Sequence, residues 1–82
     1  MPKEEILLLI RRYCAEIFAL DLADVTPDTA FDDLQADSMA LIELHTALGR
    51  HELHVDLFDF RMSMTLAEAA ELAHRAQPAP AP

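Results

Sequence analysis

The chain has 82 residues, is 52% hydrophobic, and carries 15 acidic against 6 basic side chains, for a formal net charge of −9. This length allows one small domain with a single core. The acidity excludes nucleic acid and anionic membranes as partners, because phosphate groups are bound by clustered lysine and arginine, and it favours basic protein surfaces. With Cys14 as the only cysteine, no internal disulfide is possible, which agrees with a cytoplasmic location.

The N-terminal part predicts one long helix over about residues 3–18. Pro2 followed by Glu4 and Glu5 is typical of a helix start, since proline suits the first turn and acids suit the positive end of the helix dipole. Apolar residues then recur at spacings of three and four, which predicts one buried face. These positions are Ile6, Leu9, Ile10, Tyr13, Cys14, Ile17, Phe18 and Leu20. The longest apolar run, residues 6–10, is too short for a signal peptide or a membrane span of about 20 residues.

Residues 19–37 have no sustained helical period and are rich in turn and cap residues. We expect a long loop that is fastened to the core by Val25, Phe31 and Leu34. A loop of this length is unusual in a small domain and is often functional.

A second helix is predicted over about residues 38–51. Its apolar positions are Met39, Ile42, Leu44 (or Leu41) and Leu48. Either Asp37 or Ser38 can be its N-cap, since both side chains can accept from the first-turn amides, and the sequence leaves this open.

Residues 53–57 predict an extended connector, and residues 57–62 predict a short helix anchored by Phe58 and Phe60. A last helix starts at Thr65, because Glu68 three residues later completes a capping box. We therefore predict an all-α domain over residues 1–76 with three longer helices and one short helix, followed by a Pro/Ala-rich flexible tail over residues 77–82.

Ser38 stands where the loop gives way to the second helix. Its simplest role there is capping. A catalytic serine is disfavoured, because no glycine-rich elbow and no general base accompany it. A third role is modification by another enzyme: the free amides and positive dipole of a helix start suit a phosphate group.

The other candidate residues predict no metal site and no catalytic site. His51 and His54 approach the zinc motif H-E-x-x-H but are one residue short and straddle a helix end. His45 and His74 are lone residues. Cys14 lies on the apolar face of the first helix, so we expect a core residue.

The segment 31–44 resembles the prosthetic-group site of acyl carrier proteins. That family places a Phe and a Leu before an Asp-Ser-(Leu/Met) triplet, then an apolar–Glu–Leu step, which corresponds here to Phe31, Leu34, Asp37-Ser38-Met39 and Ile42-Glu43-Leu44. The resemblance extends over residues 3–75 in element order, length and acidity. It implies a four-helix bundle of the acyl-carrier type.

The resemblance also implies a function. Ser38 would carry a 4′-phosphopantetheine arm, transferred from coenzyme A by a separate, magnesium-using phosphopantetheinyl transferase. Acyl groups would ride on the arm as thioesters, and the protein itself would catalyse nothing. The family's docking surface is the second helix, which here implies Asp37, Met39, Ile42 and Glu43. The other partners implied are an acyltransferase, a ketosynthase or an acyl- or aminoacyl-loading enzyme, acting on a monomeric, free-standing carrier.

Five residues depart from the family pattern. Gln35 stands where a glycine is common, and Ala40, Gly49 and Arg50 occupy positions that are often acidic in fatty-acid carriers. The docking helix is therefore less negative than the whole chain. This favours polyketide or hybrid natural-product (antibiotic-type) biosynthesis over primary fatty acid biosynthesis. For His54, where glycine often follows the helix, we have no sequence-based account.

Two alternatives stay open. A peptidyl or aminoacyl carrier would be loaded by an adenylation enzyme, although such carriers more often have Gly-Gly-(His/Asp)-Ser at the site, in contrast to Ala36-Asp37-Ser38 here. The second alternative is an acidic helical adaptor without a prosthetic group.

Overall fold

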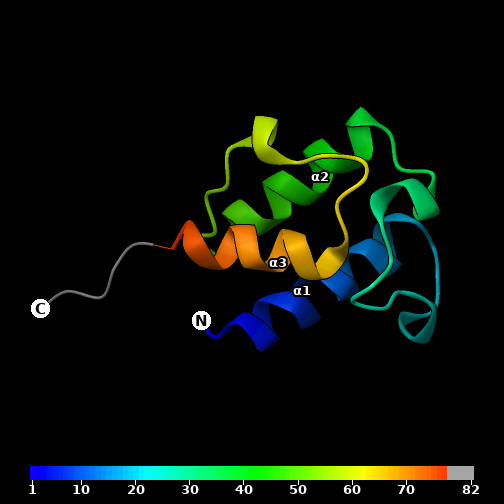
Figure 1. Ribbon diagram of the computed structural model, residues 1–82, viewed down its shortest axis with the longest axis horizontal. Coiled ribbons are helices and arrows are strands. Elements are labelled where there is room, and N and C mark those ends of the chain that lie inside the picture. Colours follow the sequence, from blue (N-terminus) through cyan, green and yellow to red (C-terminus); the bar gives the residue numbers. More distant parts are fainter. Residues whose placement is uncertain (78–82) are drawn as a thin grey trace, which may run out of the picture.

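A computed structural model describes residues 1–77 of the chain, so the tail predicted for residues 77–82 lies outside the described residues except for Gln77. Three helices and three short 3-10 helices are arranged around one core (Figure 1). In chain order they are α1 (Lys3–Ile17), η1 (Leu22–Asp24), η2 (Phe31–Leu34), α2 (Ser38–Gly49), η3 (Leu57–Asp59) and α3 (Leu66–Arg75). Residues 1–77 contain no strand, only an isolated bridge between Ala30 and Thr65. The all-α prediction is confirmed.

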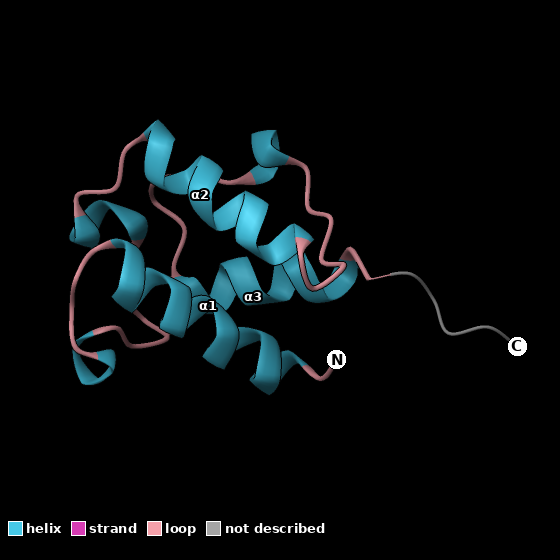
Figure 2. Ribbon diagram, turned by 180° about the vertical axis from the view of Figure 1, so that it is seen from behind, coloured by secondary structure: helices cyan, strands magenta, loops and turns pink. Residues whose placement is uncertain are grey.

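Helix α1 packs against both α2 and α3 (Figure 2). Its buried residues are Ile6, Ile10 and Cys14, as the spacing predicts. Leu20, which we expected on the same face, is 41% exposed. The reason is that α1 ends at Ile17: Ala19 takes a left-handed backbone conformation, which turns the chain away before Leu20.

The long loop between α1 and α2 is fastened from two sides. Val25 and Phe31 are buried, as predicted, and Leu34 is half-buried. The guanidinium of Arg11 donates to the carbonyls of Leu22 and Val25. On the other side, the amide of Phe31 donates to the carbonyl of Met64 at 3.1 Å. These contacts fix the loop, and with it the start of α2.

Helix α2 buries two of the predicted apolar residues, Leu44 and Leu48, but not Met39 and Ile42. Leu44, Ala47 and Leu48 are buried, whereas Met39 is 65% and Ile42 is 40% exposed. Apolar residues surround most of this helix, so the sequence pattern did not decide which of them face inward. The exposed pair lies on the turns of α2 nearest Ser38.

The short helix predicted over residues 57–62 is a single 3-10 turn, η3. The chain leaves this turn at Phe60, which is extended and buries its ring edge-on against Phe31, with ring centroids 6.2 Å apart. Burying Phe60 therefore ends the turn. Phe58, expected as a second anchor, is 90% exposed.

Helix α3 starts at the predicted capping box, in which the amide of Glu68 donates to the Thr65 hydroxyl at 3.2 Å. Its buried face consists mostly of alanine (Ala69, Ala70, Ala73), and these small side chains let α1 approach closely. A salt bridge of 2.8 Å between Lys3 and Glu71 joins the two helices at the surface. Within residues 1–77, no helix has the length and apolar character needed to cross a membrane.

Candidate functional site

The start of α2 settles which residue caps the helix. Asp37 is the N-cap: its carboxylate accepts from the amide of Ala40 at 2.9 Å, and its carbonyl accepts from the amide of Leu41. Ser38 is the first helical residue. Because Asp37 does the capping, the serine hydroxyl is not needed to hold the helix end.

Ser38 is exposed, and within residues 1–77 its hydroxyl makes no side-chain hydrogen bond. Amides in the first turn of a helix have no intrahelical acceptor, and the dipole gives this end a partial positive charge. A phosphate ester on this hydroxyl would lie beside both. The exposed carboxylate of Asp37 opposes them, although solvent screens its charge. The site thus offers an accessible alcohol in a setting that tolerates a phosphodiester.

The turn from η2 into α2 depends on Gln35. This residue has φ 55° and ψ 37°, the left-handed conformation that glycine adopts most easily. It allows the amide of Ala36 to donate to the carbonyl of Phe31 at 3.1 Å, and Ala36 itself is buried. Ala36 anchors the chain just before Asp37, which is extended and leads directly into the helix. The expected glycine is absent, but its backbone conformation is kept.

A small apolar cleft of about 270 Å³ starts at Ser38. It lies between α2 and η3 and is lined by Ser38, Leu41, Ile42, Leu57, Phe58 and Phe60. A group attached to the Ser38 hydroxyl therefore has an apolar surface directly beside it.

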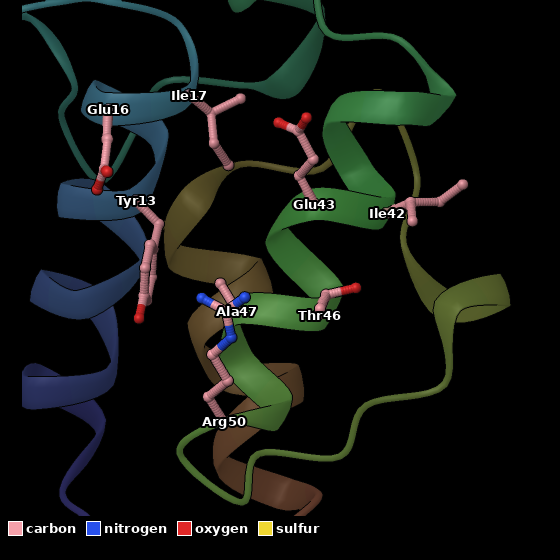
Figure 3. A pocket seen from close by; sticks show the side chains of 8 residues that line it. All are labelled: Tyr13, Glu16, Ile17, Ile42, Glu43, Thr46, Ala47 and Arg50. Atoms are coloured by element: carbon pink, nitrogen blue, oxygen red, sulfur yellow. The ribbon is translucent and has the colours of Figure 1, made fainter.

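A larger open groove of about 500 Å³ runs between α1 and α2 (Figure 3). Tyr13 and Glu16 border it from α1, and Arg50 lies at its far end from Glu43 and Ile17. The other lining residues are Ile42, Thr46 and Ala47. A second hollow of about 340 Å³ shares Ile17 and Glu43 with this groove and reaches Asp37 and Met39. The hollowed surface thus continues from the N-terminal end of α2 along the side of the helix.

Comparison with known proteins decides the family. The family model described as "Phosphopantetheine attachment site" matches residues 9–74, which include all three helices except the ends of α1 and α3. The chain belongs to the acyl carrier protein family. Its prosthetic group is 4′-phosphopantetheine, and members of this family carry intermediates for other enzymes without catalysing reactions themselves.

Two curated relatives illustrate the range of the family. An acyl carrier protein of Rubrobacter xylanophilus is 44% identical over 45 residues, which are 54% of this chain and 56% of that protein. The nonribosomal peptide synthetase inpB of Emericella nidulans is 29% identical over 72 residues, which are 88% of this chain but 3% of the synthetase. The chain thus spans less than two thirds of either relative. No solved structure matches it.

The residues at the start of α2 fit the prosthetic group. The hydroxyl of Ser38 is free, the first-turn amides lie beside it, and the apolar cleft begins at the same residue. When bound, the arm supplies a thiol that holds acyl groups as thioesters. The protein itself has to present the alcohol, hold the helix end in place and leave the site open to other enzymes.

The proposed docking residues lie along one stretch of α2 and its cap. Asp37, Met39, Ile42 and Glu43 are all exposed. Met39 and Ile42 are therefore available to a partner. From the sequence, both residues were expected on the apolar face of the helix and on the docking surface, and the pattern did not separate these two roles.

The remaining polar candidates have structural contacts. His45 donates from Nε2 to the carbonyl of Val55 at 2.7 Å and so ties the connector to α2, a role that its sequence position did not indicate. His51 shares a hydrogen bond of 2.9 Å with the Tyr13 hydroxyl. The ring of His54 lies against Gly49. No group of metal-binding side chains occurs in the described part of the chain.

Cys14 is a core residue, as predicted. Its side chain is buried in α1, and this burial raises the pKa of the thiol to about 12. The thiol therefore stays protonated and unreactive at neutral pH.

Proposed function

We propose that Ser38 is the residue that carries 4′-phosphopantetheine, within a carrier domain that spans residues 1–76. The observation that supports this most directly is that Asp37, and not Ser38, caps the start of α2. Asp37 caps the helix through its 2.9 Å contact with the amide of Ala40, which leaves the neighbouring hydroxyl exposed and free. A phosphopantetheinyl transferase needs such an alcohol as its acceptor.

On this basis the protein tethers acyl intermediates as thioesters and delivers them to enzymes such as an acyltransferase or a ketosynthase. We place it in polyketide or hybrid natural-product biosynthesis, because α2 has a single acidic residue, Glu43, and is followed by Arg50. A partner that recognises an acidic docking helix is expected to have a strongly basic surface. Such a partner would gain little from α2 of this chain.

A peptidyl or aminoacyl carrier is the second candidate, and one observation favours it. The match to the peptide synthetase covers 88% of the chain, against 54% for the acyl carrier protein. Two observations favour an acyl carrier instead: the sequence Ala36-Asp37-Ser38, and the higher identity to the acyl carrier protein, 44% against 29%.

We further propose that Asp37, Met39, Ile42 and Glu43 contact these partners. Each is exposed, and the two apolar members lie within about a turn of Ser38 on the same helix. Apolar contacts of this kind supply affinity, while the two acids orient the partner.

Intact-mass measurement tests the attachment. The protein is incubated with coenzyme A, Mg²⁺ and a broad-specificity phosphopantetheinyl transferase, and we expect a mass gain of one phosphopantetheine. The chain offers a matched control, because its two serines are Ser38 and Ser63 and both are exposed. The gain should disappear in Ser38→Ala and persist in Ser63→Ala. An unmodified wild-type chain would overturn the proposal.

Loading assays then separate the two kinds of carrier. The modified protein is offered malonyl-coenzyme A with an acyltransferase, or amino acids and ATP with an adenylation enzyme. An acyl carrier accepts the first and not the second. Loading by the adenylation enzyme alone would assign the protein to peptide synthesis.

A further inference from the structure

Phe58 is the most exposed large apolar side chain of the described residues. Its exposed fraction is 90%, whereas Phe60, two residues later, is 8% exposed and packs on Phe31. A phenylalanine gains more than most residues from burial, so leaving this ring in water forgoes a large stabilisation. The stability of the fold therefore does not explain why this ring is exposed.

The backbone of η3 holds the ring in this outward position. The carboxylate of Asp56 accepts from the amide of Phe58 at 3.0 Å, and the carbonyl of Asp56 accepts from the amide of Asp59 at 3.0 Å. Half-buried Leu57 and buried Phe60 fasten the turn to the core on either side. The ring is thus presented on a fixed turn, which lowers the entropy that a partner must remove on binding.

Phe58 also lies where an enzyme has to dock. It lines the same apolar cleft as Ser38 and Ile42. An enzyme that acts on the Ser38 hydroxyl must cover the surface around it, and this surface includes the rim of the cleft. Phe58 is therefore continuous with the one interface that attachment of the prosthetic group requires.

The charges around the ring define the chemistry of the partner. Asp56 and Asp59 flank Phe58 in sequence and are exposed, and Asp37 caps the helix on which Ser38 lies. A complementary surface has an apolar pocket for the ring and basic groups at its rim. A second copy of this chain is a poor occupant, since each copy has a net charge of −9 and would bring the same acids to the contact.

We propose that Phe58 is a recognition residue for the phosphopantetheinyl transferase, inserting its ring into an apolar pocket with a basic rim. This inference rests on the proposed attachment of the arm at Ser38. It assigns to η3, and not only to α2, a part in selecting the enzyme that modifies the carrier.

Steady-state kinetics of arm transfer test the inference, with coenzyme A, Mg²⁺ and a broad-specificity transferase. Phe58→Ala should raise KM for the carrier about tenfold with little change in kcat, because a buried aromatic anchor is lost while the acceptor hydroxyl stays in place. Phe58→Leu, which keeps an apolar side chain, should recover most of the loss. The matched control is Leu22→Ala: Leu22 is also exposed, at 37%, but lies on η1 outside the Ser38 cleft, and its change in KM should stay below about twofold.

Three results would overturn the inference. The first is equal KM for Phe58→Ala and the wild type, with the wild type fully modified. The second is a dimer of the wild type in sedimentation that Phe58→Ala abolishes, which would mean that the ring contacts a second copy of the chain. The third is an unchanged KM combined with faster hydrolysis of the acyl thioester in Phe58→Ala, which would mean that the ring contacts the carried acyl group. Modification at a residue other than Ser38, or none in the wild type, would instead reject the proposed function.

Discussion

Three residues outside the regular helices have left-handed backbone conformations, and none of them is glycine. Ala19, Gln35 and Glu52 have φ values of 55°, 55° and 62°. Each ends a helical segment in the same way, with an amide donating to a carbonyl five residues earlier: Leu20 to Ala15, Ala36 to Phe31, and Leu53 to Leu48. Glycine is the usual residue at such a position, because a Cβ costs energy there. The chain thus holds strain at three turns, one of which leads into α2.

Replacing Gln35 with glycine should stabilise the protein. Relief of the left-handed strain contributes about 1–2 kcal/mol, and the extra chain entropy of glycine removes about 0.5–1 kcal/mol, so we expect a net gain of about 0.5–1 kcal/mol. Urea unfolding measures this difference. Ala23→Gly, within η1 and without a positive φ, should lose stability by a similar amount. Destabilisation by Gln35→Gly would show that this backbone is not strained.

The two residues at the start of α2 should separate stability from function. Asp37→Ala removes the cap and should cost about 1 kcal/mol, whereas Asp37→Asn keeps a capping side chain and should cost much less. Ser38→Ala should change stability by less than about 0.5 kcal/mol, because its hydroxyl holds nothing in the fold. Thermal unfolding of the three variants checks this order. A large loss in Ser38→Ala would mean that the serine is a structural residue.

At the level of whole elements, α1 connects the other two helices. It packs against α3 and α2, and its buried residues Ile6, Ile10 and Cys14 belong to the same core as the buried residues of both helices. Lys3 and Glu71 join α1 to α3 at the surface, 2.8 Å apart, and Arg75 reaches the same carboxylate at 3.1 Å. The site at the start of α2 depends on this frame and on the loop that passes over it.

The link between α1 and α3 gives a pH-dependent contribution to stability. The hydrogen bond and the charge of Lys3, with a smaller contribution from Arg75, lower the pKa of Glu71 below its ordinary value of 4.5. A lowered pKa in the folded state stabilises the protein above pH 4.5, and this contribution disappears as the pH falls through the folded-state value. Lys3→Ala should therefore weaken the loss of stability with acidification in this range, while Lys3→Arg should retain it. Denaturant unfolding at a series of pH values between 6 and 3 measures the effect; identical pH profiles for all three proteins would contradict it.

The packing around α2 makes opposite predictions for two apolar residues. Phe31 is 1% exposed and lies in the core, so Phe31→Ala should cost about 3–5 kcal/mol, a large part of the stability of so small a domain. Ile42 is 40% exposed, so Ile42→Ala should cost less than about 1 kcal/mol. Urea unfolding of both variants checks the contrast. Equal losses would mean that Ile42 is a core residue after all.

For the molecule as a whole, the charge is not spread evenly over the fold. The net charge is −9, but α2 contains one acidic residue, Glu43, while the loop over residues 19–37 contains Asp21, Asp24, Asp28, Asp32, Asp33 and Asp37. The exposed side of the helix that bears Ser38 therefore combines the apolar residues Met39 and Ile42 with a single charge, at Glu43. We therefore expect the overall field to attract partners over a distance, and Met39 and Ile42 to supply apolar contacts when the partners dock.

Much of this arrangement could be predicted from the sequence, for identifiable reasons. The first helix has a regular period, and Thr65 and Glu68 form a capping box, so both elements were predicted correctly. The pattern around Asp37-Ser38-Met39 predicted the family, which the comparison confirms. The exposure of Ile42 and Phe58 could not be predicted from the sequence, because both residues stand in apolar stretches where every position looks suited to a core. Which of them faces inward depends on where α1 and Phe31 lie, and this is set by contacts between residues far apart in the chain.

The most direct test of the account is to locate the prosthetic group on the modified protein. After incubation with coenzyme A, Mg²⁺ and a transferase, trypsin separates the two serines, because Arg50 and Arg61 lie between them. Mass spectrometry should find phosphopantetheine on the peptide of residues 13–50, with fragmentation assigning it to Ser38. The peptide of residues 62–75, which contains Ser63, should be unchanged. Phosphopantetheine on any residue other than Ser38, or on none, would contradict the assignment of this site.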